Sequence, residues 1–513
     1  MFKHATVKKS LILLVAALVC VAVFLSACGE KPFTPNFDAP KGLTVESNGG
    51  IAVKYGDYVY YVNGYESDPS ADNTYVDVND APRIGSVLRI SIADLKKVLA
   101  INEDEDLTNS QKTENIADAV RDYAEVVVPK IYYSNNTETA RLNGIFIFND
   151  RLYMLTPNDK LTAGGDTQTD QSVLMSFDLN GANPERHFTF TTNTAQVKLY
   201  EKDNKVMATY LMSSKLHVLD VAAGKDTQVT NDDETAGSVK FVEDGNRLFF
   251  INADGAICQL VDGETSAQVV VQNNKDWEIA YTISSVVNEY VYYTVTYDNN
   301  PDLSGAVLYY ATYNETVAQT EYETEDEYAA TRKVAYYDPA SISSAWTGWK
   351  EDKLVIVQSD TFNNDTYYGI YISYVTKSAD DELAVEQVRV LQEGFNDSSI
   401  TINKIVGDTL YYTAGNVTYV KDLSKFVENG AIVENKTESQ SFGTPYAASL
   451  STTTTGWALS DIVTVTETVD GETVTHTYMF SLSSNSVSVV EFNSEKKTNS
   501  TAAALTLTAK TED

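Results

Sequence analysis

Cysteine and histidine are scarce in this chain. The 513 residues contain three cysteines, and only Cys258 lies beyond the first 30 residues, so the body of the chain cannot form an intramolecular disulfide. Cys258 stands in the apolar run 256–260, which predicts a small core residue rather than a reactive thiol. The later histidines, His187, His217 and His476, lie too far apart for a ligand spacing such as H-x3-H. The sequence therefore gives no support to a histidine-based zinc or copper site.

Basic residues are also few. The chain has 38 lysines and arginines against 72 aspartates and glutamates, a net charge of −34 at pH 7. Nucleic-acid binding requires a basic surface, so we exclude nucleic acid as a partner. The same charge repels anionic lipid headgroups, which excludes attachment to a membrane through a polybasic surface. Acidic residues spread over many loops are typical of a solvated exterior, and attraction of calcium or of a cationic ligand is the alternative.

The motifs of the common enzyme classes are missing from the sequence. There is no G-x-S-x-G elbow, no H-E-x-x-H, no phosphate-binding loop and no dinucleotide fingerprint. No stretch alternates helical and strand patterns as an α/β hydrolase domain would. Carboxylate pairs are abundant, but 72 acidic residues produce such pairs by chance. The sequence therefore identifies no catalytic residue.

The N-terminal segment has the parts of a bacterial export signal. Lysines among the first nine residues precede the unbroken apolar run 11–24, and the sequence Leu-Ser-Ala-Cys follows at residues 25–28. The apolar run is too short to span a bilayer comfortably, so we do not expect a transmembrane anchor. The four residues 25–28 resemble the lipobox of bacterial lipoproteins.

This resemblance implies cleavage before Cys28 and attachment of diacylglycerol to its sulfur. Residues 1–27 are then a lipoprotein signal peptide, and the acyl chains hold the protein at the membrane through Cys28. We expect an extracytoplasmic location, on the outer face of the cytoplasmic membrane, or on the periplasmic side if the host has two membranes. Prolines punctuate residues 28–48, which predicts an extended tether after the lipidated cysteine.

One pattern recurs eight times after the tether. A turn, in most copies a pair of Gly, Asp, Asn or Glu residues, precedes a short run of mostly apolar or aromatic residues. The runs are residues 58–62, 152–155, 206–210, 248–251, 290–293, 354–357, 410–412 and 462–465, the last being the weakest. Intervals mostly of about 40 to 65 residues indicate an internal repeat. Tyrosine, with 33 copies, favours β structure, and partner strands after many of the runs predict hairpins.

The repeated runs are apolar on both faces. In residues 58–62, Tyr60 and Val62 point one way, whereas Val59 and Tyr61 point the other. A strand with one wet face would alternate apolar with polar residues. Two dry faces predict sheets stacked against one another around an axis, which is an all-β fold of the β-propeller type with four-stranded blades. Eight blades of about 45 residues fit the length best, and seven fit nearly as well.

The repeats predict a propeller over residues 49–493 and a C-terminal tail at residues 494–513. Two stretches interrupt the pattern. Residues 93–125 have helical periodicity and predict a small helical insertion after the first hairpin. Residues 314–345 contain a run of glutamates and predict an acidic insertion.

The sequence Tyr-Val-Tyr-Tyr at residues 58–61 and 290–293, with partner strands such as residues 216–220, resembles uncharacterised bacterial surface lipoproteins with a TolB-like or YWTD-like β-propeller. A looser similarity links the chain to the eight-bladed outer-membrane assembly lipoprotein with pyrroloquinoline-quinone-type repeats. The strict Tyr-Trp-Thr-Asp tetrad and the tryptophan-containing blade signatures are absent. The resemblance implies a binding or scaffolding platform, and a fold alone does not fix a function.

Aromatic residues in the later part of the chain suggest a ligand site. Trp346 and Trp349 could stack on a sugar or another flat ligand, and Tyr367 and Tyr368 could join them. The alternative is that these tryptophans pack beside a strand.

Asp360 and Asp365 stand in a polar loop between these aromatic pairs and offer oxygen ligands of the kind that Ca²⁺ prefers. The loop does not match the twelve-residue EF-hand pattern, and an ordinary polar loop is the alternative. Calcium is the one cofactor that the sequence suggests. Residues 68–80 hold a similar group of acidic side chains.

We expect a monomeric, membrane-anchored lipoprotein that acts as a non-enzymatic binding or scaffold platform for a protein, a peptide or a glycan. One alternative is a carbohydrate-active lyase or hydrolase that uses carboxylates in the propeller channel. Another is an envelope assembly factor.

Overall fold

The computed structural model describes residues 35–64 without 47, 85–129, and 144–337 with gaps at 159–167, 192–193, 231–236, 242–246, 288–289, 306, 314–321 and 323. It also describes the strands between residues 346 and 443, and residues 461–507 without 470, 484–485 and 494–497. Between residues 336 and 462 the description covers the backbone alone.

The described strands form seven antiparallel four-stranded sheets and one of five strands, besides a small pair. The first sheet contains β1 (Ala52–Tyr55), β2 (Tyr58–Val62), β3 (Val87–Ser91) and β4 (Glu125–Val128). The second contains β5 (Phe146–Phe148), β6 (Arg151–Asn158), β7 (Gln168–Asp178) and β8 (Glu185–Phe190). The third contains β9 (Thr194–Lys202), β10 (Lys205–Met212), β11 (Lys215–Asp220) and β12 (Lys225–Gln228). The fourth contains β13 (Gly237–Phe241), β14 (Arg247–Ile251), β15 (Ile257–Val261) and β16 (Gln268–Val271).

The remaining sheets follow in chain order. The fifth contains β17 (Ile279–Val287), β18 (Tyr290–Tyr297), β19 (Val307–Thr312) and β20 (Lys333–Tyr337). The sixth contains β21 (Trp346–Lys350), β22 (Lys353–Phe362), β23 (Tyr367–Lys377) and β24 (Leu383–Arg389). The seventh contains β25 (Ile400–Val406), β26 (Thr409–Ala414), β27 (Val417–Asp422) and β30 (Gln440–Gly443), with the pair β28 (Val427–Glu428) and β29 (Ala431–Ile432) beside it in the chain. The eighth contains β31 (Asp461–Val469), β32 (Glu472–Ser483), β33 (Ser486–Asn493), β34 (Thr498–Asn499) and β35 (Ala503–Ala504).

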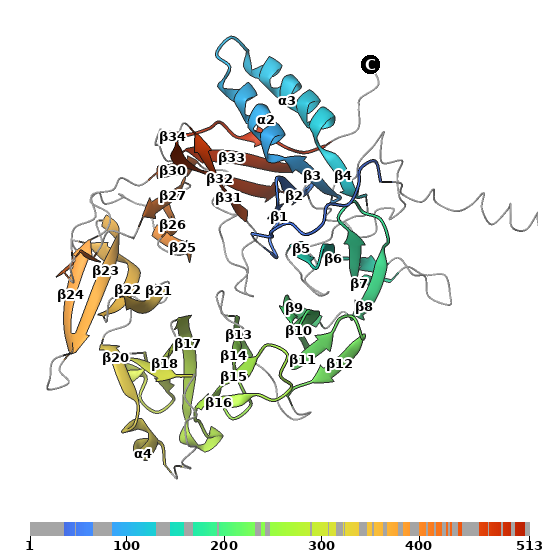
Figure 1. Ribbon diagram of the computed structural model, residues 1–513. Helices are drawn as coiled ribbons and strands as arrows, with labels where there is room; N and C mark the ends of the chain where they lie inside the picture. The colour runs from blue at the N-terminus through green and yellow to red at the C-terminus, as the bar shows by residue number, and fades with distance from the viewer. Residues whose placement is uncertain are drawn as a thin grey trace, which may run out of the picture.

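The sheets are arranged as a ring, in which the first strand of each sheet lies toward the centre and the last strand toward the rim (Figure 1). Consecutive first strands touch in several places, since β13 contacts β17 and β17 contacts β21. β1 also contacts β31, which joins the first sheet to the last. The join is made by packing, because no strand pairing in the described part of the chain links these two sheets. The chain therefore has a mostly β, propeller-like fold.

The prediction that the repeated runs are dry on both faces is confirmed at β2. Val59 and Tyr61 are fully buried in a core shared with the eighth sheet, which contributes Val463, Tyr478 and Val489. Tyr60 and Val62 are fully buried in a second core, shared with residues of the second sheet such as Ile147, Leu152 and Met154. The first sheet thus has another sheet on each side.

The turn pairs that precede the repeated runs have a conformational role. Asn149 and Asp150 join β5 to β6 with φ values of 47° and 59°, and Asp203 and Asn204 join β9 to β10 with φ values of 52° and 60°. Two successive residues with positive φ match the twist of a tight hairpin, and Asn and Asp tolerate this conformation better than most residues. The turn residues therefore fix where each hairpin bends.

Two helices, α2 (Ile92–Glu103) and α3 (Asn109–Tyr123), lie between β3 and β4, within the stretch expected to be a helical insertion. Ser91 caps α2 and Thr108 caps α3, in the second case with a capping box to Gln111. Their buried side chains extend the core shared by the first and eighth sheets. Within the acidic insertion the structure has α4 (Glu325–Ala329) and then β20, which is the last strand of the fifth sheet. The short 3-10 helices η1 (Lys275–Trp277) and η2 (Pro301–Leu303) complete the helical elements of the described residues.

Both ends of the described chain pack on the ring. In the segment expected as a C-terminal tail, β34 and β35 pair with β33, and the side chains of Ala503 and Leu505 are fully buried. Ala503, Leu505 and Leu507 stand at every second position and are buried, so one face of the segment covers the core. In the expected tether, Val45 pairs with Tyr55 of β1.

Among the described residues, no helix is both long and apolar enough to cross a bilayer.

Candidate functional site

The aromatic residues predicted to bind a ligand all belong to the sixth sheet. Trp346 and Trp349 are in β21, and Tyr367 and Tyr368 begin β23. The backbone register pairs Trp346 with Val357 and Tyr368 with Thr361, both in β22. These two positions of β22 are four residues apart, or about 13 Å along a strand. The backbone therefore places the two aromatic pairs in one sheet, but not at the same point along it.

Of the three residues predicted for calcium binding and lipidation, the structure describes only Asp360. Asp360 is in β22 and pairs with Gly369, close to the end of the hairpin where the tyrosines stand. Asp365 and Cys28 lie outside the described residues. The calcium site and the lipidation site both remain predictions. Among the described residues, no group of three histidine, cysteine or acidic side chains could hold a metal ion.

Each described histidine is engaged by neighbouring groups. His217 Nδ1 lies 2.9 Å from Asp226 Oδ2, and its ring stacks on Tyr210 at 5.2 Å between centroids. His476 lies between two carboxylates, with Nδ1 2.5 Å from Glu491 Oε1 and Nε2 2.9 Å from Glu467 Oε1. Because these carboxylates lie at opposite ring nitrogens, they do not converge on one point where an ion could bind.

A serine and a histidine of the second sheet have the geometry of an activated nucleophile. Ser176 Oγ lies 2.7 Å from His187 Nε2 and accepts a hydrogen bond from Arg151 Nε at 3.1 Å. Burial lowers the pKa of His187, so the ring is held neutral. Ser176 is, however, fully buried, and the His187 ring stacks on Tyr153. A substrate could not reach this hydroxyl, and the pair acts as a buried cross-strand contact.

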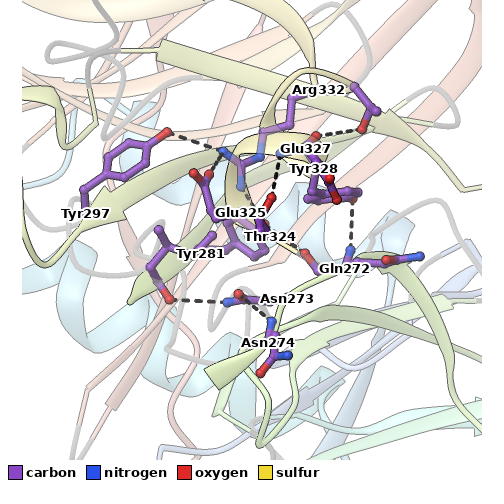
Figure 2. A network of polar contacts seen from close by, with 12 residues as sticks. Gln272, Asn273, Asn274, Tyr281, Tyr297, Thr324, Glu325, Glu327, Tyr328 and Arg332 are labelled. Carbon is purple, nitrogen blue, oxygen red and sulfur yellow. Dashed lines mark hydrogen bonds and ion pairs between the residues drawn. The ribbon is translucent and has the colours of Figure 1, made fainter. Parts of the chain in front are cut away.

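A polar cluster around Arg332 fixes the acidic insertion to the fifth sheet (Figure 2). Arg332 follows α4, and its side chain is 1% exposed. One terminal nitrogen lies 2.7 Å from Glu325 Oε1, and the other donates to the hydroxyl of Tyr281 of β17 at 3.1 Å. Tyr297 of β18 accepts a further, longer hydrogen bond of 3.4 Å from the guanidinium. The insertion is thus held at its base by a buried ion pair.

Aromatic rings surround the same guanidinium. The centroids of Tyr281, Tyr309 and Tyr328 lie 5.5 to 5.7 Å from its central carbon, within the range of a cation–π contact. Tyr328 also stacks on Trp277 of η1, with 5.6 Å between ring centroids, and its hydroxyl accepts from the backbone nitrogen of Gln272 at 3.0 Å. The cluster therefore joins α4 to the segment that leads from the fourth sheet into the fifth.

A second polar cluster fixes the helical insertion. Lys96 of α2 lies 2.7 Å from Glu467 Oε2 of β31, and the other oxygen of Glu467 contacts His476 of β32. The hydrogen bond from Lys96 lowers the pKa of Glu467, which keeps this carboxylate ionised. Nearby, Asn102 of α2 donates to the backbone oxygens of residues 501 and 502. The two insertions are therefore both held by charged and polar contacts to the ring.

These features define a class of protein: an all-β, propeller-like ring with two insertions fixed to its sheets. No protein-family model matches the chain, and no curated protein matches it. Among solved structures, it is similar to the dihydro-heme d1 dehydrogenase NirN in complex with DHE, with 9% identity over 92% of this chain and 75% of that chain and a TM-score of 0.39. It is also similar to dipeptidyl peptidase 4 of Porphyromonas gingivalis (9% identity, 92% and 62% coverage, TM-score 0.37) and to Hsv2 of Kluyveromyces lactis (10% identity, 68% and 92% coverage, TM-score 0.32). Similarities this low carry no argument about function.

Proposed function

We propose that this protein is an extracytoplasmic lipoprotein, anchored through Cys28, whose eight-bladed propeller is a non-enzymatic binding platform for a protein, a peptide or a glycan. The observation that carries the proposal is the way both insertions are fixed. Arg332 forms an ion pair with Glu325 at the base of one insertion, and Lys96 joins the other insertion to Glu467 of β31. Loops positioned by a rigid scaffold are typical of recognition surfaces.

The anchor is tested by replacing Cys28 with serine in the full chain. The parent protein is expected in the membrane fraction with a mass increase that corresponds to acyl chains. Cys28→Ser is expected to lose that mass. A parent protein without the added mass, or a Cys28→Ser protein that still carries it, would contradict the proposed lipid anchor.

The binding role is tested with a soluble protein that begins at residue 29. This protein is immobilised and exposed to envelope extracts and to a glycan array. Retention of a defined protein, peptide or glycan is expected. A protein that retains none of these, while its circular dichroism shows a folded β protein, would contradict the proposal.

We place the ligand at the sixth sheet. Trp346 and Trp349 are three residues apart in β21 and therefore lie on opposite faces of the strand. We propose that one of them stacks on the ligand and that Tyr367 or Tyr368 of β23 extends the contact on the same face. One of Trp346→Ala and Trp349→Ala is expected to weaken binding of the retained ligand about fivefold or more, because stacking of a flat base on an aromatic ring contributes about 1–3 kcal/mol. The other variant is expected to bind normally. Thr347→Ala, between the two tryptophans, is the matched control and is expected to bind normally. Equal affinities for all variants would place the ligand elsewhere.

We further propose that Asp360 and Asp365 hold a calcium ion beside this ligand site. Calcium is expected to raise the melting temperature of the parent protein, because a ligand that binds only the folded state stabilises it. Asp360→Asn and Asp365→Asn should remove this shift. Asp302→Asn, which changes an exposed aspartate of η2 between β18 and β19, should keep it. An unchanged calcium response in the first two variants would refute the site.

A further inference from the structure

The N-terminal strap, residues 35–46, is bound to the ring along its length. At its C-terminal end it runs beside β1, where Glu46 N donates to Lys54 O at 3.2 Å and Gly56 N donates to Thr44 O at 3.1 Å. These two hydrogen bonds, with the bridge between Val45 and Tyr55, add a short extra strand segment to the inner edge of the first sheet. The end of the strap is therefore part of the sheet.

The middle of the strap is held by the second sheet. Gly42 N donates to Asp150 Oδ1 at 2.9 Å, and Asp150 belongs to the turn between β5 and β6. The hydroxyl of Tyr55 donates to the same carboxylate and accepts a hydrogen bond from Leu43 N at 3.2 Å. The strap therefore crosses from the first sheet to the second.

The start of the strap is fixed by Phe37. Its ring centroid lies 3.5 Å from the guanidinium carbon of Arg89 of β3, and the Tyr58 ring lies 4.2 Å from the same carbon. Arg89 is 5% exposed and is held by Glu125 of β4, with 2.6 Å between Nε and Oε2. The backbone oxygen of Phe37 accepts from Asn180 Nδ2, in the turn between β7 and β8, at 3.1 Å.

A guanidinium that is buried against an aromatic ring and a carboxylate is a stronger anchor than an exposed contact, because both partners are desolvated. Phe37 therefore marks the point where the chain leaves the ring, at the seam between the first and second sheets. The strap begins at this seam, near β4 and β7 in Figure 1.

We propose that the strap shortens the membrane tether and holds the seam of the first and second sheets next to the lipid bilayer. The inference rests on the proposed lipidation of Cys28. A tether that ran free from Cys28 to β1 would have 24 residues and a reach of about 80 Å, whereas the nine residues from Cys28 to Phe37 reach at most about 30 Å. The strap thus reduces the free reach by more than half.

Charge cannot provide this orientation in place of the strap. The chain carries a net charge of −34, which repels anionic headgroups, so no electrostatic attraction would turn one edge of the ring toward the membrane. The sixth sheet, where we place the ligand, lies on the opposite side of the ring from the seam (Figure 1). The strap would therefore keep that sheet away from the edge that is nearest to the lipid.

The experiment uses the full, lipidated protein in vesicles of neutral phosphatidylcholine that contain an acceptor-labelled lipid. A donor dye is placed on Glu185→Cys, at the start of β8 near the seam, or on Asp302→Cys, in η2 between β18 and β19. Both positions are exposed. Cys258 is buried. The parent protein, which has no introduced cysteine, is the control for labelling at Cys258. Energy transfer to the lipid is expected to be stronger from residue 185 than from residue 302.

Two changes should allow the seam of the first and second sheets to move away from the bilayer, each in a different way. Phe37→Ala with Asn180→Ala removes the start of the strap, and a flexible insertion of about 20 residues after position 34 lengthens the tether while leaving the strap in place. Both are expected to reduce transfer from residue 185 and to narrow its difference from residue 302. Asp38→Ala, which changes an exposed residue of the strap, is the control and is expected to keep the difference.

Vesicles that float with the protein but show equal transfer from the two positions would overturn the strap proposal and leave the lipid anchor intact. Protein that does not float with the vesicles would overturn the lipid anchor itself, and the strap proposal with it. If the double alanine variant does not fold, the insertion variant decides, because unchanged transfer from residue 185 with the longer tether would also overturn the proposal.

Discussion

The two buried tyrosines at the centre of β2, Tyr60 and Tyr61, each fill a hydrophobic core and donate a hydrogen bond. Tyr60 and Tyr61 fill the cores on opposite faces of the first sheet, and each hydroxyl reaches a backbone oxygen of another segment. Tyr60 donates to Leu179 at 3.1 Å, and Tyr61 donates to Leu505 at 3.2 Å. A phenylalanine would fill the same space without this link.

The buried tyrosines predict sensitivity to alkali. Burial raises the pKa of Tyr60 and Tyr200 to about 12, whereas an unfolded chain ionises its tyrosines near 10. Above pH of about 10 the unfolded state therefore binds fewer protons than the folded state, and stability falls as the pH rises. We expect the phenolate absorbance of the buried tyrosines to appear together with loss of the β circular-dichroism signal. Full phenolate absorbance near pH 10 in a protein that is still folded would contradict the burial of these rings.

The ion pair at the base of the acidic insertion predicts a large mutational effect. Arg332→Ala leaves Glu325 without its buried partner, and breaking such a pair costs about 3–5 kcal/mol. Arg121→Ala removes an exposed partner of Asp118 on α3, for which about 0.5 kcal/mol or less is expected. Unfolding in urea measures both variants. Similar losses for the two would show that Arg332 is not a buried anchor.

At the scale of elements, the C-terminal segment packs against the first sheet. Asn63, fully buried, donates through Nδ2 to the backbone oxygen of Leu507 at 3.0 Å and accepts from the backbone nitrogen of Leu507 at 2.9 Å. Leu505 is fully buried in the core that the first and eighth sheets share. The segment therefore closes the seam between these sheets.

Changes in this segment should destabilise the seam as a unit. Leu505→Ala removes a buried side chain, for which about 2–5 kcal/mol is expected. Asn63→Ala removes both hydrogen bonds and should also lower the free energy of unfolding. Thr501→Ala, at an exposed position of the same segment, should change stability by less than about 0.5 kcal/mol. Hydrogen exchange is the measurement, and β2 should lose protection together with β33 in the first two variants. Loss of protection in β33 alone would contradict a shared core.

The sequence predicts those elements that depend on local patterns. Turn pairs such as Asn149 with Asp150 and the two dry faces of residues 58–62 are visible in neighbouring residues, and so is the helical periodicity of residues 93–125. The packed C-terminal segment has a local signal as well, in the alternation of leucine and threonine at residues 505–508. That pattern is short, so the sequence alone predicts an ordinary C-terminal tail for this segment.

The contacts that fix the insertions and the strap could not be predicted from the sequence. Lys96 and Glu467 are 371 residues apart, and Asn63 and Leu507 are 444 residues apart. A single sequence has no pattern that connects such positions, because the contact exists only once the ring is formed. Phe37 offers one weak signal, since a large aromatic residue within a proline-rich tether favours packing of that tether on the folded ring.

At the scale of the whole molecule, the central claim is that the first and eighth sheets are neighbours. They share one hydrophobic core, the helices α2 and α3 cover part of it, and Lys96 reaches Glu467 across the seam. A two-layer arrangement would instead leave one face of each sheet in water. The position of the last sheet relative to the first therefore distinguishes a ring from a sandwich.

Carbodiimide cross-linking with peptide mass spectrometry tests this claim most directly, because the reagent joins only amines and carboxylates that are in contact. Lys96 Nζ and Glu467 Oε2 are 2.7 Å apart, with side chains 30% and 37% exposed, so both can react. We expect a cross-linked peptide between residues 96 and 467 in the monomer, and its loss in Lys96→Arg. Recovery of the local Lys205–Asp220 cross-link without any product between residues 96 and 467 would contradict the ring.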